Sequence, residues 1–365
     1  MIRSRGVVGL AVLLVAVLSA GAPFAGWAQD ESQVGRGRTG DGSNAFSGLG
    51  AAPEANLFHG AATMSVPIEV PPGRQTMTPS LALSYSSSGR MTPYGYGWDL
   101  GLGMIQRSTR NGVPSCGDGD DLSAFVINLP GSSSECRLAL DSNDPATLEN
   151  GKCEPLVRQA AIDIQYEETG NFWVVRDVSG IKYTFGEVPS ARVGSNVDEL
   201  YVETGTSCGY TFGWGLNRIE DTNGNNIDIH YVDEATSELP PADGVLYPRL
   251  IEYGGRREGE SRTEGENQTE GENQTPGHAH KFSVQFAWSS FGESAPWITS
   301  IGGFEAKVDR LLEEVRVVSP GAEPFLRRYE LTYAQDAEAH PGAPRLLSQV
   351  ALFGRNPADS SDQTG

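Results

Sequence analysis

Strict two-residue alternation of large apolar side chains is the feature that most constrains this chain. A period of two places such side chains on one face of an extended strand, and no segment has the spacing of a long amphipathic helix. The sequence therefore predicts an all-β fold, a multi-stranded antiparallel sheet or sandwich-like arrangement with long loops. The alternating sets are Met64/Val66/Ile68/Val70, Leu81/Leu83/Tyr85, Ile162/Ile164/Tyr166, Ile181/Tyr183/Phe185, Ile227/Ile229/Tyr231, Phe282/Val284/Phe286/Trp288 and Tyr329/Leu331/Tyr333.

Turn-forming residues separate these segments, in a chain that holds 45 Gly and 22 Pro. The segment 221–226 reads DTNGNN and lies between two strand-like runs, 216–219 and 227–231. Asn-Gly supplies the positive φ angles that a tight hairpin needs. The segment 177–180, DVSG, has the same place between 172–176 and 181–185. Two hairpins are therefore expected.

The first residues predict export. Arg3 and Arg5 precede an apolar run from Gly6 to Ala20, and the small residues Gly26 and Ala28 fit the −3 and −1 positions of a cleavage site. We expect a signal peptide over residues 1–28 and secretion to the extracellular region or the periplasm, with no membrane span after cleavage. An uncleaved membrane anchor is the alternative. Residues 29–55, rich in Gly, Ser, Ala and Asp, are expected to be a flexible lead-in.

The chain is acidic, with a formal net charge of −20. Such a charge repels nucleic acids and anionic membrane surfaces, so no nucleic-acid partner is expected. Solubility outside the cell explains the charge more simply than an acidic binding function does.

The four cysteines are Cys116, Cys136, Cys153 and Cys208. An even number in an exported protein favours two disulfides, with three connectivities open, and free buried thiols are the alternative. No pair has the C-x-x-C spacing of a zinc or redox site.

A tandem repeat interrupts the strand pattern, because TEGENQ occurs at 263–268 and again at 269–274. It lies between the strand-like runs 250–253 and 282–288, and it has no apolar residue with which to build a core. We expect a disordered, dispensable surface loop over 257–280. This loop lies within a β domain of 56–356, which a polar tail of 357–365 follows.

Three groups of residues could be catalytic or metal-binding by residue type, but their sequence context supports neither role. The E-x-E pairs Glu258/Glu260, Glu264/Glu266 and Glu270/Glu272 match the residue pattern of arginine-directed ADP-ribosyltransferases, but they lie in or beside the repeat. The acidic stretches 117–121 and 221–226 lack the ligand spacing of a calcium loop, so turn chemistry explains them better. The histidines are expected to be solvated, His230 on a strand and His278 and His280 beside the repeat. No catalytic, cofactor-binding or metal-binding residue is therefore predicted, and no enzyme.

The segment 60–114 holds a series of short motifs in a fixed order. These are Gly60-Ala61-Ala62, Pro67-Ile68, Pro71-Pro72-Gly73-Arg74, Pro79-Ser80-Leu81, Leu83-Ser84-Tyr85, Gly95-Tyr96-Gly97-Trp98 and Ile105-Gln106-Arg107-Ser108-Thr109. With these motifs the segment resembles the opening of the Salmonella virulence plasmid B protein (SpvB) family, which the B component of insecticidal toxin complexes (TcdB/TcaC-like, Rhs-related) shares. A weaker resemblance, in the hairpins 173–186 and 214–231, extends the match over about 44–355.

The resemblance implies a carrier role. In toxin complexes the B component supplies a β-propeller and, with its C partner, a hollow shell of Rhs-type strands around a toxic part. In the Salmonella protein a separate C-terminal domain is the ADP-ribosyltransferase. This chain reaches Gly365 before any such region, so we expect a truncated or split product, or a free-standing relative. The leading hypothesis is a non-catalytic secreted scaffold that acts with a protein partner or a missing C-terminal propeller, Rhs or effector portion. An exported cell-surface binding or adhesion module of the same fold is the alternative.

Overall fold

The computed structural model describes a subset of the chain. The described residues are 53–56, 60–75, 77–110, 124–130, 132–138, 151–155, 162–167, 169–194, 211–233, 244–256, 279–291, 296–300, 302–320, 325–334 and 343–354. The predicted signal peptide (1–28) and polar tail (357–365) lie outside them. The lead-in (29–55) and the low-complexity loop (257–280) do so except for residues 53–55 and 279–280. These boundaries stay predictions.

The described residues form strands and one short 3₁₀ helix, η1 (Pro189–Ala191), which confirms the all-β prediction. A four-stranded sheet has the order β1-β2-β3-β6. Its strands are β1 (Glu54–Asn56), β2 (Ala61–Ile68), β3 (Leu81–Ser86) and β6 (Trp98–Asp99). Two small pairs are β4 (Met91–Thr92) with β5 (Gly95–Tyr96), and β19 (Trp297–Thr299) with β20 (Ala306–Val308).

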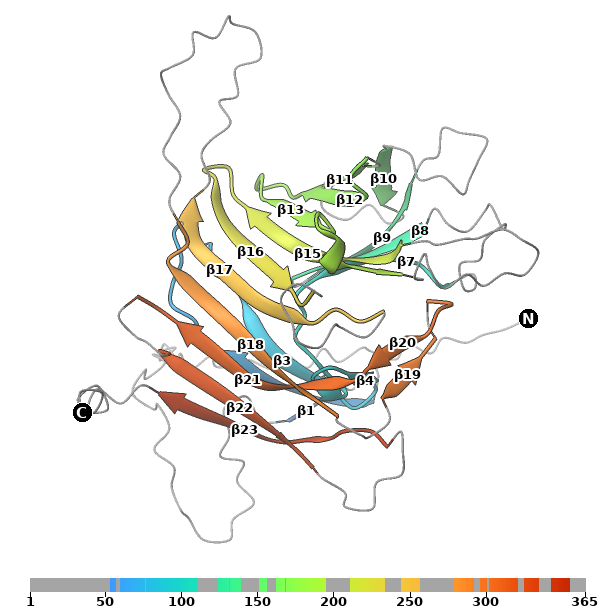
Figure 1. Cartoon of the computed structure of the whole chain (residues 1–365). Helices are drawn as coiled ribbons and strands as arrows, with labels where there is room; N and C mark the ends of the chain where they lie inside the picture. The colour runs from blue at the N-terminus through green and yellow to red at the C-terminus, as the bar shows by residue number, and fades with distance from the viewer. Residues whose placement is uncertain are drawn as a thin grey trace, which may run out of the picture. The chain divides into compact units, whose positions relative to one another are not determined.

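The large sheet has 15 strands and follows chain order over most of its width, β7 to β13 on one side and β15 to β23 on the other (Figure 1). All its pairings are antiparallel, as expected when neighbours along the chain pair in sequence. Its strands are β7 (Met104–Arg107), β8 (Ala124–Leu129), β9 (Ser132–Leu138), β10 (Gly151–Pro155), β11 (Asp163–Glu167), β12 (Phe172–Arg176), β13 (Lys182–Phe185), β14 (Arg192–Gly194), β15 (Thr211–Glu220), β16 (Asn225–Tyr231), β17 (Pro248–Arg256), β18 (Phe282–Ser290), β21 (Arg310–Val318), β22 (Arg327–Tyr333) and β23 (Leu347–Gly354).

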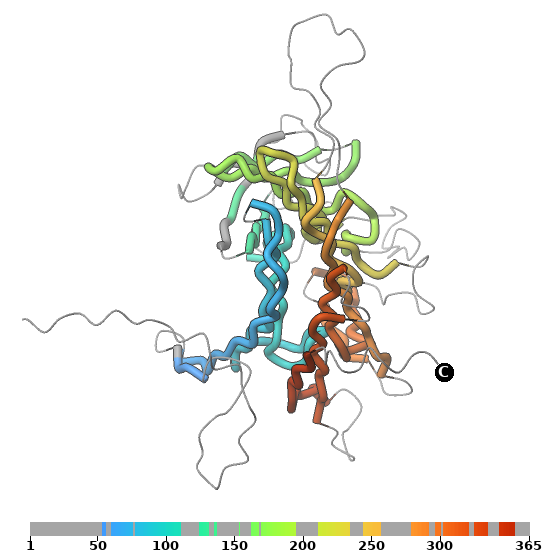
Figure 2. Tube along the Cα trace, turned by 90° about the vertical axis from the view of Figure 1, so that its left-hand side faces the viewer, coloured from blue at the N-terminus to red at the C-terminus, as the bar shows by residue number. Residues whose placement is uncertain are grey.

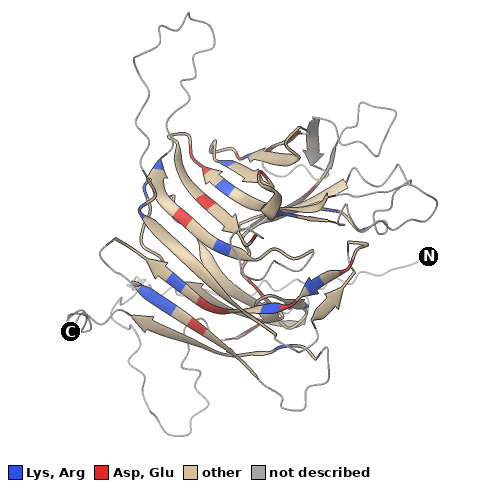
Figure 3. Cartoon of the chain, viewed as in Figure 1, with Lys and Arg blue, Asp and Glu red and all other residues tan. Residues whose placement is uncertain are grey.

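The alternating apolar positions lie in the core, as predicted. In β16 the side chains of Ile227, Ile229 and Tyr231 are all buried, and in β18 Val284 and Phe286 are buried. Charged residues of both signs recur along the strands of the large sheet (Figure 3), and less buried positions alternate with buried ones in β17 and β21. Several of these charged residues pair across strands, such as Arg176 of β12 with Asp163 of β11, 3.8 Å apart. One face of the sheet therefore packs inward while the other is polar.

Both predicted hairpins form, but the β15–β16 turn differs from the predicted one in its backbone conformation. In the β15–β16 turn Gly224 N donates to Asp221 O at 3.0 Å, and in the β12–β13 turn Gly180 N donates to Asp177 O at 3.0 Å. Gly224 has a φ of 79° and Gly180 a φ of 81°. Asn223 was expected to share the positive φ of an Asn-Gly turn, but only the glycine adopts it. Each turn therefore needs a single left-handed residue, as a type I turn followed by a glycine does.

A ring of strand pairings encloses an aromatic cluster. Strands β7 to β13 pair in order, and β15 pairs with both β7 and β13. Within the ring, Phe125 and Trp173 have ring centroids 4.6 Å apart, and Trp173 and Trp214 have theirs 5.7 Å apart. Arg107, from the family-like I-Q-R-S-T segment, is only 4% exposed, and its guanidinium lies 5.8 Å from the Trp214 ring. Arg107 of this family-like segment is therefore a core residue.

A disulfide joins Cys136 in β9 to Cys153 in β10, with 5.6 Å between their Cα atoms. This confirms that the cysteines form at least one disulfide. Cys116 and Cys208 lie outside the described residues.

The four-stranded sheet and the large sheet form two layers. Strands β2 and β3 lie behind β17, β18, β21 and β22 in Figure 1 and beside them in Figure 2. One apolar core holds both, since Val66 and Leu83 belong to the same buried cluster as Val315 and Val317. Among the described residues, no helix has the length and apolar character needed to cross a membrane.

Candidate functional site

Several residues weighed for chemistry in the sequence lie outside the described part of the chain. These are the three E-x-E pairs, the acidic stretch 117–121 and His278. Asp221 is described, and its Oδ1 accepts hydrogen bonds from Asn223 N at 2.8 Å and Asn225 N at 2.9 Å. The turn chemistry predicted for this stretch is therefore confirmed. In the part of the chain that the structure describes, no three His, Cys, Asp or Glu side chains group so as to hold a metal ion.

The prediction that His280 is solvated is wrong. Its Nε2 lies 3.0 Å from Asn226 Nδ2 and 3.3 Å from Asp228 Oδ2, and its side chain is 21% exposed. The reason is tertiary, because β17 pairs with both β16 and β18 and so brings the start of β18 within side-chain reach of β16. His230 faces Glu252 across the β16–β17 pair, 3.3 Å away, and both side chains are more exposed.

Asp228 is the charged centre of this polar cluster. Arg218 Nε donates to Asp228 Oδ1 at 2.5 Å, and Arg218 also reaches Glu187 Oε2 at 3.1 Å. Burial by itself would raise the pKa of Asp228, but hydrogen bonds from His280 and Arg218 outweigh burial and hold that pKa below its usual range. Arg218 and Asp228 are cross-strand partners in β15 and β16. The cluster therefore fastens neighbouring strands.

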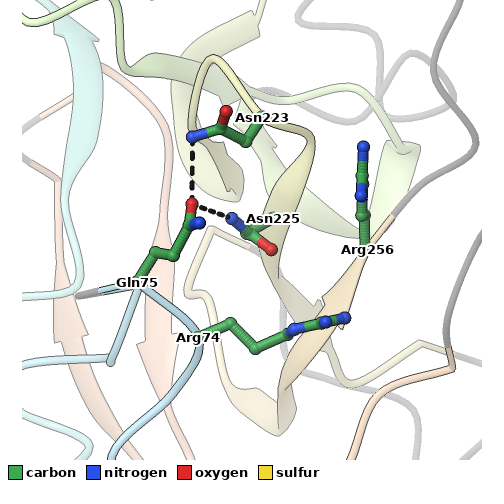
Figure 4. Close-up of a pocket in the computed structure, with 5 residues that line it drawn as sticks. All are labelled: Arg74, Gln75, Asn223, Asn225 and Arg256. Carbon is green, nitrogen blue, oxygen red and sulfur yellow. Dashed lines mark hydrogen bonds between the residues drawn. The ribbon is translucent and has the colours of Figure 1, made fainter. Parts of the chain in front are cut away.

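A polar pocket of about 340 Å³ opens where the β2–β3 connection meets the β15–β16 turn (Figure 4). Arg74 and Gln75 reach it from the connection, Asn223 and Asn225 from the turn, and Arg256 from the end of β17. Neighbouring Gly73 permits the connection to fold tightly, because a Cβ there would lie 1.9 Å from Met77 O.

Hydrogen bonds fix the three carboxamides of the pocket. Gln75 Oε1 accepts from Asn223 Nδ2 at 3.0 Å and from Asn225 Nδ2 at 3.2 Å (Figure 4). Asn225 Nδ2 also donates to Asp221 Oδ2 at 2.8 Å. A carboxylate only accepts hydrogen bonds, so Asp221 determines which end of the Asn225 amide faces it. The bonds then leave Gln75 Nε2 and Asn225 Oδ1 available to a ligand.

The two arginines of the pocket have donors to spare. Arg256 Nε is buried and has no hydrogen-bond partner among the described residues. Neither Arg74 nor Arg256 forms an ion pair with an acidic residue in the described ranges. Since a guanidinium carries five N–H donors and no acceptor, the pocket offers mainly hydrogen-bond donors and positive charge.

A second pocket, of about 330 Å³, is mostly apolar and includes Tyr85 and Trp98, whose ring centroids lie 5.3 Å apart. Strands β2 and β3 and the start of β23 form it. Its lining residues are Pro53, Ala62, Thr63, Met64, Tyr85, Tyr96, Trp98, Leu346 and Leu347.

Sequence reasoning did not single out the polar pocket. Arg74 was quoted as part of the Pro71-Pro72-Gly73-Arg74 signature, where a charged residue follows three turn formers. This arginine was the one hint of a binding site in the sequence, because the end of a strand explains the prolines and the glycine but not a charged residue after them. Nothing local links Arg74 to Arg256, which lies far away in the sequence.

A comparison with protein-family models matches the chain to one family. The family model described as Salmonella virulence plasmid 65kDa B protein matches residues 56–299. Curated relatives include the Mono(ADP-ribosyl)transferase SpvB of Salmonella choleraesuis (strain SC-B67) and of Salmonella enteritidis, each 25% identical over 218 residues. The match covers 53% of this chain and 35% of each relative, so the chain spans only about a third of their length.

Solved structures share the fold. The N-terminal domain of effector protein SpvB from Salmonella typhimurium strain LT2 superposes with a TM-score of 0.55 and 18% identity, covering 80% of this chain and 99% of that domain. The TcdB2-TccC3 structure gives a TM-score of 0.60 and 19% identity, covering 89% of this chain and 17% of that one.

Proposed function

The chain belongs to the Salmonella virulence plasmid 65kDa B protein family, and from that premise we propose that it is a non-catalytic structural module of a toxin-like protein. In this proposal the chain leaves the cytoplasm, loses residues 1–28, and provides shell or carrier scaffold in a larger assembly. The described strands supply the wall of that scaffold, and the effector chemistry belongs to another polypeptide or another region.

The observation that carries the proposal is where this fold occurs in larger proteins. It accounts for 99% of the N-terminal domain of SpvB but for only 17% of the TcdB2-TccC3 chain. A fold that recurs as one part of much longer chains suits a scaffold that presents or encloses other parts. The two components named in TcdB2-TccC3 favour a protein partner for this chain as well.

The polar groups of the described strands support a structural role. The residues whose pKa values shift are mainly buried tyrosines, and Tyr253 and Tyr333 donate their hydroxyl hydrogens to backbone carbonyls. Catalytic groups are usually recognised as perturbed residues gathered in a cleft. Here the perturbed residues pack inside the core or between neighbouring strands.

The test is an activity assay on the exported protein. Protein recovered from outside the cytoplasm of its native host is sequenced from its N-terminus and then incubated with labelled NAD and a eukaryotic lysate. We expect Gln29 as the first residue and no transfer of label, because the E-x-E pairs lie in or beside the low-complexity repeat, whereas catalytic groups must be held within about half an ångström of their working positions. The Salmonella SpvB protein serves as the positive control for transfer.

A Glu258→Ala, Glu260→Ala double variant makes the result decisive. Transfer of label by the native sequence that disappears in this variant would overturn the non-catalytic assignment. An intact Met1 would overturn the export assignment separately.

A further inference from the structure

We propose that the pocket lined by Arg74, Gln75, Asn223, Asn225 and Arg256 binds an oxyanion, a carboxylate or a phosphate group, through its two guanidinium groups. The inference goes beyond the scaffold role and does not depend on it. The site is termed the arginine pocket below.

Charge is the first argument. The chain has 47 acidic and 27 basic residues, yet among the five described residues that line the arginine pocket two are arginines and none is acidic. Two guanidinium groups that line one pocket without an acidic partner in the described residues attract an anion to it. Arginine binds carboxylate and phosphate oxygens through paired, nearly parallel hydrogen bonds, which gives such a site both affinity and geometry.

Burial is the second argument. Arg256 Nε is shielded from solvent and has no hydrogen-bond partner in the described residues. A buried donor that stays unpaired destabilises the folded chain, so such an atom at the wall of a pocket points to an acceptor supplied from outside. An oxyanion meets this need because it presents only acceptors.

The amides are the third argument, because they are held in place before any ligand arrives. Gln75 Oε1 is occupied by the two asparagine amides, which directs Gln75 Nε2 away from them (Figure 4). Gln75 holds a φ of 46°, an uncommon conformation for a residue other than glycine. Strained, preorganised backbone of this kind clusters at binding sites. An amide N–H therefore joins the guanidinium groups as a third donor.

Because the arginine pocket lies between two layers of the fold, a ligand bound there should stabilise the folded chain. Arg74 and Gln75 belong to the connection that follows β2, whereas the other three residues come from the β15–β16 hairpin and from β17, both part of the large sheet. The site exists only when the two layers are packed together. A ligand that binds only the folded state raises the melting temperature, and the increase grows with the logarithm of the ligand concentration once that exceeds the Kd.

The experiment is calorimetric titration of the full chain with two probes. Inorganic phosphate represents a free oxyanion, and the blocked peptide acetyl-Gly-Glu-Gly-amide represents the side-chain carboxylate of a protein segment. Acetyl-Gly-Gln-Gly-amide, which lacks the charge, is the control ligand. We expect at least one anionic probe to bind and to raise the melting temperature. Phosphate alone would identify a free phosphate, and the peptide alone would identify an acidic protein segment.

Variants connect the binding to the site. Arg74→Ala, at an exposed position, should weaken binding by about tenfold or more, since a hydrogen-bonded charge contributes on that scale. Arg256→Ala should do the same. Arg90→Ala removes an equal charge from an exposed position outside the arginine pocket and should leave the affinity unchanged. Arg74→Ala tests the proposal even if Arg256→Ala proves unstable.

Two outcomes would overturn the inference. One is the absence of both heat and thermal stabilisation with either anionic probe. The other is binding that Arg74→Ala and Arg90→Ala weaken equally, which would indicate general attraction to positive charge. Neither outcome bears on NAD transfer, so this proposal and the scaffold proposal fail independently.

Discussion

At Gly97 the backbone has a φ of 81°, and a Cβ there would lie 2.6 Å from Ser86 O and 2.7 Å from Tyr85 Cε2. The aromatic ring of Tyr85 packs over this bare backbone. Gly101 has a similar φ of 64° but no atom within 4 Å of the corresponding position. A substitution at Gly101 therefore tests the cost of the backbone conformation alone, and a substitution at Gly97 tests the same cost together with the loss of packing space.

The residue-scale prediction compares alanine at these two positions. Gly101→Ala should lower the free energy of unfolding by about 1 kcal/mol, the cost of a left-handed conformation for a residue with a Cβ. Gly97→Ala should cost about 3 kcal/mol, because overpacking adds to the same conformational cost. Denaturant unfolding measures both changes. Equal losses would mean that Tyr85 moves aside without cost.

At the scale of elements, two tyrosines of the large sheet fasten the segment that follows β2. Tyr253 of β17 donates its hydroxyl hydrogen to Pro71 O at 2.9 Å, and the hydroxyl oxygen of Tyr329 of β22 accepts from Glu69 N at 2.9 Å. Proline ends the β2 ladder and leaves backbone groups without strand partners. The tyrosine hydroxyls provide partners for two of these groups and join the two layers.

The element-scale prediction removes each hydroxyl in turn. Tyr253→Phe and Tyr329→Phe should each lower the free energy of unfolding by about 1–2 kcal/mol, because each leaves a backbone group between the layers without its partner. Tyr85→Phe is the matched control, since the Tyr85 hydroxyl has no hydrogen bond to another described residue. Thermal or denaturant unfolding gives the comparison. A loss in the control as large as in the other two variants would contradict the explanation.

At the scale of the whole molecule, the core contains many tyrosines that stay neutral. Burial raises the pKa of Tyr94, Tyr231, Tyr253 and Tyr333, and it is also the main cause of the raised pKa of Tyr247 and Tyr329. These side chains lie in β16, β17 and β22, just before β17, and in the β4–β5 turn. Their ionisation is therefore coupled to unfolding of the fold as a unit.

The whole-molecule prediction is an alkaline unfolding transition. A tyrosine in the unfolded chain ionises near pH 10. Because the folded pKa values are higher, the folded state binds more protons above that pH, so stability is full below about pH 10 and falls as the pH rises further. Tyrosinate absorbance and loss of β-sheet circular dichroism should change together. Ionisation of all the tyrosines near pH 10 with the β-sheet signal intact would be the contrary result.

The sequence by itself determined the seven strands marked by apolar alternation and the turns of two hairpins. Alternation such as Ile227, Ile229 and Tyr231 marks a buried face wherever the strand pairs, because side-chain direction in a strand is a local property. The Asp-x-x-Gly turns of both hairpins follow from hydrogen bonds within a few residues. The resemblance of residues 60–114 to the virulence plasmid B proteins identified the family for the same reason, since contiguous motifs survive in the chain as written.

Only the tertiary structure decided which distant residues meet. Four cysteines left three connectivities open until β9 and β10 brought Cys136 to Cys153. His280 appeared solvated until the β17–β18 hairpin placed it beside Asp228. The arginine pocket joins Arg74 to Arg256 across the two layers. Such contacts depend on how sheets pack and not on local periodicity, so no window of sequence contains them.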